Sequence, residues 1–319
     1  MPSFPKLPPA VSGELRETVG RAGRLSYYVA GEGSPLLLIH SINAAGSVYE
    51  VKPIFEDQCQ RRKVYAVDLP GFGMSDRSDR SYEVRLYVDA VHDMLDLIEA
   101  ENGQVPIDAL AVSLASEFLA LAATERPRPP RTLALVTPTG FGRAVGMFAK
   151  EPGQSREIPG FYAFFTFPLW SQGIFDLLTS RVSIRYFLER TFGSKQIDEG
   201  MFEYDYLTTH QPGAKNAPLA FVSGKLFTSG IRTFYEKLEM PVWVPHGTRG
   251  DFKDFSGANW AKAKANWHFQ PYDTGALPHF ERPVEFLQSY EAFLTAETGD
   301  AGVKARARRP DRPSRSDAA

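Results

Sequence analysis

Ser113 is the residue whose surroundings are best suited to chemistry. It stands where a short apolar run, Ala109–Val112, changes directly into an Ala- and Leu-rich segment that begins at Leu114. This pattern predicts a strand, a tight turn and a helix, with the serine hydroxyl exposed on the turn. The positive end of the helix dipole would stabilise negative charge that develops beside the hydroxyl. We therefore predict that Ser113 is a nucleophile; the alternative is a serine that only caps the helix.

A serine nucleophile needs a base, and His279 is the histidine best placed to be one. It lies in a Gly- and Pro-containing loop just before a final amphipathic segment, 283–297. An acid that orients this histidine should follow the apolar run Val242–Val244, where Asp251 is the first choice and Asp254 the alternative. The resulting chain order of Ser, Asp and His is the order that nucleophile-elbow hydrolases use.

The segment His40-Ser41-Ile42-Asn43 follows an apolar run at the point where an oxyanion-binding loop would lie. An oxyanion hole needs two backbone N–H groups aimed at the developing alkoxide. The N–H groups of Ile42 and Leu114 are the candidates. The ring of His40 itself is expected to be structural.

The elements that must position these residues show a regular alternation. Continuous apolar runs at Leu36–Ile39, Val64–Val67, Ile107–Val112 and Leu133–Val136 are typical of strands buried on both faces of a sheet. Between them, Val84–Ile98 has apolar residues at three-and-four spacing, which predicts a helix with one buried stripe. The chain is therefore predicted to be an α/β protein, with a mostly parallel sheet flanked by helices.

This alternation stops after Gly140 and resumes at Pro241. It predicts a core in two parts, 1–140 and 240–299, interrupted by a mainly helical cap at 141–239. Aromatic residues of that cap are expected to line an apolar substrate pocket: Phe161, Phe164, Phe165 and Phe167.

Together these features resemble the α/β-hydrolase superfamily, in its capped form with a serine nucleophile. The most specific stretch is Val64–Arg77, VYAVDLPGFGMSDR, and the likeness covers roughly 25–140 and 240–295. The resemblance implies a catalytic triad and an oxyanion hole made by Ser113, Asp251 and His279 with Ile42 and Leu114. The chain departs from the usual pattern in having Ser41, Ala111 and Ala115 where glycines are common.

The predicted function is hydrolysis of an apolar ester or related acyl compound through an acyl-enzyme. Two alternatives stay open: a carbon–carbon bond hydrolase on the same triad, and a hydrolase-like ligand-binding protein with little turnover. Epoxide-hydrolase and dehalogenase chemistry is disfavoured, because in those relatives the elbow residue is an Asp. No cofactor is expected, since Asp76 takes the place of the third glycine in the candidate dinucleotide motif, and no metal is expected, since the sequence has no paired-His motif and no Cys/His cluster.

Composition and charge limit the kinds of partner and compartment that we expect for this protein. The formal net charge is −2, so no nucleic acid is expected, although residues 300–319 form a basic tail that we expect to be disordered. Cys59 is the single cysteine, which fits a reducing compartment, and no apolar run reaches the ~20 residues of a membrane span. The expectation is a cytoplasmic protein with a small apolar substrate and an oligomeric state that the sequence leaves open.

Overall fold

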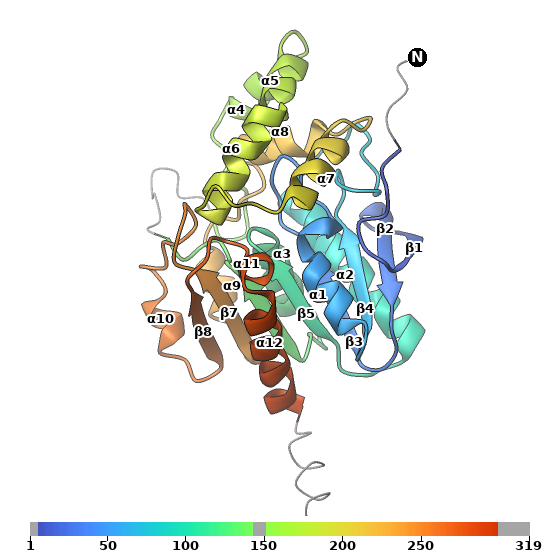
Figure 1. Ribbon diagram of the computed structural model, residues 1–319, viewed down its shortest axis with the longest axis vertical. Coiled ribbons are helices and arrows are strands. Elements are labelled where there is room, and N and C mark those ends of the chain that lie inside the picture. The colour runs from blue at the N-terminus through green and yellow to red at the C-terminus, as the bar shows by residue number, and fades with distance from the viewer. Residues whose placement is uncertain (1–5, 143–150, 299–319) are drawn as a thin grey trace, which may run out of the picture.

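The computed structural model describes residues 6–142 and 151–298, so the predicted basic tail lies outside the described residues (Figure 1). One eight-stranded sheet runs through the molecule in the order β1-β2-β4-β3-β5-β6-β7-β8. β1 and β2 pair antiparallel, as do β2 and β4, and every later pairing is parallel. The predicted mostly parallel α/β sheet is confirmed. Its strands are β1 (Glu14–Gly20), β2 (Gly23–Ala30), β3 (Pro35–Ile39), β4 (Lys63–Asp68), β5 (Asp108–Val112), β6 (Thr132–Val136), β7 (Val242–Gly247) and β8 (Trp267–Tyr272).

Helices cover both faces of this sheet, which explains the continuous apolar runs (Figure 1). In β3, Leu37 and Ile39 belong to the core shared with α2 (Val84–Asn102) and α3 (Ala115–Glu125). The alternate residues Leu36 and Leu38 belong to the opposite core, shared with α1 (Lys52–Gln58) and α12 (Pro283–Thr298). Because successive side chains of a strand point to opposite faces, both must be apolar when helices cover both sides.

Helices without intervening strands follow β6 in the described part of the chain, and we call this segment, 151–239, the helical insertion. Figure 1 shows α4 to α8 projecting beyond one end of the sheet, whereas α9 packs against α3. The domain boundaries at residues 140 and 239 stay predictions, and residues 143–150 lie outside the described part. The helices are α4 (Phe161–Thr166), α5 (Ser171–Leu178), α6 (Arg181–Phe192), α7 (Glu199–Thr209), α8 (Asn216–Val222) and α9 (Ile231–Tyr235).

A buried carboxylate ties the helical insertion to the core. Glu117 of α3 is fully buried, and its two oxygens accept hydrogen bonds from the Thr139 hydroxyl at 2.5 Å and the Thr228 N–H at 2.8 Å. Burial raises the pKa of Glu117, and these bonds partly oppose that rise.

The remaining short helices are η1 (Val48–Val51), α10 (Asn259–Lys262) and α11 (Pro278–Glu281). Within the described ranges, no helix has both the length and the apolar character that a membrane crossing requires.

Candidate active site

Ser113 occupies a strained turn between β5 and α3. Its φ angle is +52°, in the left-handed region that costs a residue with a Cβ roughly 1–2 kcal/mol. The Ser113 N–H donates to the Val136 carbonyl at 2.8 Å, and the Ser113 carbonyl accepts the N–H of Ser116 at 3.1 Å. Ala111 and Ala115, on either side, are completely buried, so their small size lets the strand and the helix meet. The surrounding backbone therefore holds Ser113 in its strained conformation, as is common at functional sites.

The loop after β3 is held in place by a buried glutamate. Glu50 of η1 accepts hydrogen bonds from the Ser41 N–H at 2.7 Å, the Ser41 hydroxyl at 3.0 Å and the Asn43 side-chain amide at 2.6 Å. Burial raises the pKa of Glu50, while the bonds from Ser41 and Asn43 act in the opposite direction. Three donors on one carboxylate fix the path of the chain between Ser41 and Asn43.

Two backbone donors near Ser113 are not engaged. Neither the Ile42 N–H nor the Leu114 N–H donates to any residue in the described ranges, and both residues line the cavity that contains Ser113. The Ser113 hydroxyl likewise has no hydrogen-bond partner within those ranges. An unengaged hydroxyl beside two unengaged N–H groups is the set of atoms that attack on a carbonyl requires.

His40 supports the same loop from behind. Its Nε2 accepts the Leu69 N–H at 2.9 Å, so the ring proton is on Nδ1, which donates to the Ser41 carbonyl at 2.6 Å. Complete burial lowers the pKa of His40 to about 4, which keeps the ring neutral. The ring thus links the end of β3 to the end of β4, and both of its nitrogens are occupied.

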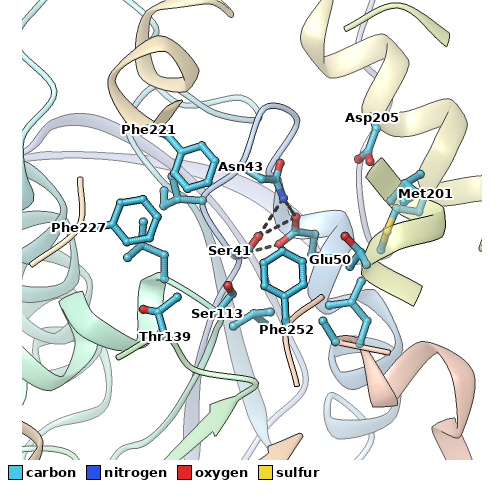
Figure 2. Close-up of a pocket in the computed structure, with 17 residues that line it drawn as sticks. Ser41, Asn43, Glu50, Ser113, Thr139, Met201, Asp205, Phe221, Phe227 and Phe252 are labelled. Carbon is cyan, nitrogen blue, oxygen red and sulfur yellow. Dashed lines mark hydrogen bonds between the residues drawn. The ribbon is translucent and has the colours of Figure 1, made fainter. Parts of the chain in front are cut away.

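Figure 2 shows the cavity that Ser113 shares with the loop after β3. Its volume is about 130 Å³, and we call it the serine cavity. Phe221 and Phe227 of the helical insertion and Phe252 after β7 supply aromatic walls. Glu50 and Asp205 are its two titratable lining residues, and no histidine contributes to the lining.

The loop after β8 contributes Ala276 and Leu277 to the serine cavity. The Ala276 N–H donates to the Thr191 carbonyl of α6, and its carbonyl accepts the Thr137 hydroxyl, both at 2.8 Å. The preceding Gly275 packs so closely that a Cβ there would lie 2.2 Å from the Thr191 carbonyl oxygen. A Cβ on Gly247, at the end of β7, would lie 1.9 Å from the Gly275 carbonyl oxygen. This loop is therefore fixed by contacts on both sides, with the Ala276 methyl group at the cavity wall.

His279 lies behind this wall, fully buried. Its Nε2 is 2.7 Å from the Glu50 carbonyl oxygen, so that nitrogen carries the proton and donates, and Nδ1 has no partner within the described residues. The ring packs between Phe280 and Phe286, with centroids 5.1 and 5.4 Å away. Burial lowers the pKa of His279 to about 4. In this conformation His279 supports η1 and is not hydrogen-bonded to Ser113.

Neither candidate acid is hydrogen-bonded to His279, because Nδ1 is unpaired and Nε2 is bonded to the Glu50 carbonyl. The Asp251 carboxylate pairs with the Arg190 guanidinium of α6, and both side chains are more than 40% exposed. Asp254 accepts the Ser256 N–H at 3.0 Å. The structure therefore brings Ser113, Ile42 and Leu114 together but does not bring Ser113, Asp251 and His279 into one hydrogen-bonded chain.

A comparison with known protein families agrees with the fold described above. A family model described as the alpha/beta hydrolase family matches residues 36–289. The chain belongs to this family. Membership confirms the predicted resemblance and identifies the chain as a hydrolase of the α/β type.

Individual relatives of this alpha/beta hydrolase are distant. An uncharacterised protein of Mycobacterium tuberculosis is 28% identical over 124 residues, which are 39% of this chain and 35% of that protein. The match therefore spans about a third of the length of that curated relative. Among solved structures, a serine hydrolase involved in carbazole degradation superposes with a TM-score of 0.67 at 16% identity, covering 89% of this chain and 100% of that one. A carboxylesterase from Bacillus subtilis superposes with a TM-score of 0.65 at 14% identity, covering 89% and 92%. At these identities the structural likeness establishes the fold.

The aromatic residues predicted to line the pocket of this α/β-hydrolase lie elsewhere. Phe161, Phe164 and Phe167 are about half exposed on and after α4, where they gather with Phe165 and Trp170. None of them contributes to the lining of the serine cavity. α4 has no fully buried residue: Tyr162 packs partly against the core, whereas Phe161, Phe164 and Phe165 contact one another. Phe221, Phe227 and Phe252 line the cavity in their place.

Glu50, Asp205 and Ala276 are among the lining residues of this hydrolase that the sequence did not single out. No motif surrounds Glu50 or Asp205, and both owe their position to tertiary contacts between distant segments. For Ala276 a signal existed, because it shares a short loop with His279. That loop has no periodic pattern that would predict which of its side chains faces Ser113.

Proposed function

We propose that the chain hydrolyses an apolar ester or related acyl compound, with Ser113 as the nucleophile. The Ser113 oxygen attacks the substrate carbonyl, and the N–H groups of Ile42 and Leu114 stabilise the oxyanion. The alcohol then leaves, and water releases the acyl group from Ser113. The single observation that carries this proposal is the unengaged hydroxyl of a residue at φ +52°, in one cavity with two unengaged N–H groups.

The acyl group would lie against the aromatic wall of the serine cavity. Phe221, Phe227 and Phe252 offer apolar surface there, and burying such surface stabilises a ligand by roughly 25 cal/mol per Å². The helical insertion would thereby act as a cap that selects substrates, through these residues rather than through α4.

For the proton of Ser113 we propose Glu50 as the acceptor, with Ser41 as a relay. Glu50 lines the same cavity, and Ser41 already donates its hydroxyl proton to the Glu50 carboxylate. Ser41 can take the proton of Ser113 while passing its own to Glu50, and the reverse transfer protonates the leaving alcohol. A carboxyl whose pKa is raised by burial is a better base near neutral pH than an ordinary one.

The triad of Ser113, Asp251 and His279 is the competing assignment. It requires His279 to release the Glu50 carbonyl and enter the cavity, and it requires Asp251 to leave Arg190. Under the Glu50 assignment, His279 is a positioning residue that holds η1.

The test is covalent labelling with a fluorophosphonate probe, combined with hydrolysis of p-nitrophenyl butyrate. We expect wild type to be labelled and Ser113→Ala to lose both labelling and turnover with little change in melting temperature. Ser116→Ala, a buried serine one helical turn further on, is the matched control and should retain both. Turnover retained in Ser113→Ala would remove the nucleophile assignment.

Two further variants separate the proton acceptors. Glu50→Gln should lower kcat by two decades or more, since general base catalysis typically contributes 10²–10⁴. His279→Gln keeps a donor for the Glu50 carbonyl and should lower kcat far less. A larger fall in kcat for His279→Gln than for Glu50→Gln would indicate that His279 is the base.

A second function has its own support: a hydrolase-like protein that binds a ligand but turns it over slowly. The observation that favours it is Ala276, whose methyl group lines the cavity where the loop after β8 faces Ser113. Fluorophosphonate labelling without measurable ester turnover would favour this reading.

A further inference from the structure

Asp205 is a buried carboxylate whose side chain has no polar partner among the described residues. It belongs to α7 of the helical insertion and is 6% exposed. Its side chain forms no hydrogen bond and no ion pair with any residue in the described ranges, whereas Glu50 nearby receives three hydrogen bonds. Figure 2 shows the Asp205 carboxylate pointing down from α7 toward the serine cavity, which it lines. Burying an ionisable group costs free energy unless something compensates it, so an unpartnered carboxylate here indicates a missing ligand group.

Asp205 also stands where two cavities adjoin. A second cavity of about 320 Å³ lies between the helical insertion and the loops after β3 and β7. It shares six lining residues with the serine cavity: Asn43, Leu188, Thr191, Asp205, Phe221 and Phe252. A ligand that reaches Ser113 through the second cavity therefore passes Asp205.

The charges around Asp205 are negative. Its pKa is raised well above the ordinary value, chiefly by burial and then by the negative charges of Glu50 and Asp198. Among the residues that line the second cavity, the one guanidinium belongs to Arg190, which is paired with Asp251. No described lysine or arginine forms an ion pair with Asp205, so a positive charge brought by a ligand would be the first to do so.

We propose that Asp205 binds an ammonium group of the substrate, whose apolar part lies against Phe221 and Phe252. This inference rests on the proposed function in taking the serine cavity as the substrate site. An ammonium group next to Asp205 favours the ionised form of its carboxyl, to which it then donates charge-assisted hydrogen bonds, and aromatic faces beside it add cation–π attraction. The substrate class is then an acyl compound that carries an amine, rather than a purely hydrocarbon ester.

The experiment measures binding to the Ser113→Ala protein, so that turnover plays no part. Benzylamine and benzyl alcohol have nearly the same shape and differ in charge, and calorimetry gives the affinity of each. We expect the amine to bind at least tenfold more tightly than the alcohol. Adding Asp205→Asn to Ser113→Ala should weaken binding of the amine at least tenfold. The affinity for the alcohol should stay within twofold of its value in Ser113→Ala. Asp176→Asn, an exposed carboxylate on α5 of the same insertion, is the matched control and should change neither affinity.

Equal affinities of amine and alcohol in Ser113→Ala would overturn the proposal without any change at Asp205. A preference for the amine that survives Asp205→Asn would overturn it as well. Retained alcohol binding shows that the Asp205→Asn cavity is intact, and Asp205→Ser serves if the asparagine variant does not fold. Fluorophosphonate labelling of wild type tests Ser113 independently. Labelling without amine preference refutes only the Asp205 site, and amine preference without labelling refutes only the hydrolase mechanism.

Discussion

The turn after β5 and the loop after β8 both reach the serine cavity, yet they hold their key residues in different ways. At the first, the backbone strains Ser113 to φ +52° and leaves its hydroxyl without a partner. At the second, both backbone groups of Ala276 are hydrogen-bonded, and the imidazole of His279 is bonded to the Glu50 carbonyl behind the wall. One segment keeps its reactive group available, whereas the other keeps its titratable group occupied.

Under the proposed function, this difference separates the geometry of the nucleophile from the position of its base. Strain at Ser113 is maintained by the strand, the helix and the bond to Val136, none of which involves the loop after β8. The availability of a histidine base depends on which side chain of that loop faces the cavity, whereas the proposed acceptor Glu50 lies on η1. The predictions below test this separation, from the largest expected effect to the smallest.

Ala276→His should raise the rate of p-nitrophenyl butyrate hydrolysis by tenfold to a hundredfold. The substitution adds an imidazole to the wall of the cavity that contains Ser113, and general base catalysis by a positioned group contributes on the order of 10²–10⁴. Steady-state kinetics at pH 7.5 measures it. The double variant Ser113→Ala, Ala276→His should be inactive, and a rate in Ala276→His no higher than that of wild type would contradict the expectation that an imidazole at this wall acts on Ser113.

His279→Gln should weaken the dependence of stability on pH between 6.5 and 4. The folded-state pKa of His279 is about 4, below the ordinary value of 6.5, so the unfolded chain binds more protons in this window. Stability is therefore fully present above pH 6.5 and is lost as the pH falls toward 4, by roughly 3 kcal/mol for a shift of this size. Urea unfolding of both proteins at pH 7 and at pH 4.5 measures the difference. Identical pH dependence would mean that the ring is not held neutral by burial.

Ser113→Gly should stabilise the protein by about 1 kcal/mol while abolishing labelling. Glycine adopts a positive φ without the steric cost that Ser113 bears, although it adds entropy to the unfolded chain, so the net gain is modest. Ser113→Ala keeps a Cβ and should show no such gain. Thermal or urea unfolding of the pair gives the comparison, and equal stability would show that the turn is not strained.

Asp251→Asn should change ester hydrolysis by less than twofold and stability by less than about 1 kcal/mol. The carboxylate pairs with Arg190 at an exposed site, where ion pairs contribute little. A fall of several decades in kcat would instead mean that Asp251 orients a histidine during turnover.

Sequence patterns predicted the parts of this molecule that repeat or alternate. The apolar runs of β3 and β5 identified a sheet covered on both faces, and the strand-to-helix change located the turn at Ser113. Which side chains of a loop or a short helix point toward the cavity could not be predicted in the same way. The four phenylalanines at 161–167 looked like a pocket lining, but three of them are about half exposed and α4 packs on the core through Tyr162, which only the folded structure shows. Glu50 and Asp205 come from distant segments whose meeting depends on how the helical insertion docks.

The contact between Gly247 and Gly275 restricts how this site could change by mutation. Neither position accepts a Cβ without moving the backbone of β7, of the loop after β8 or of α6, because the nearest atoms are main-chain oxygens. Stepwise acquisition of a new side chain from the loop after β8 therefore has to go through positions 276 and 277, which already line the cavity. A directed-evolution library that seeks new chemistry on this scaffold should leave both glycines invariant and place its diversity at those two neighbours.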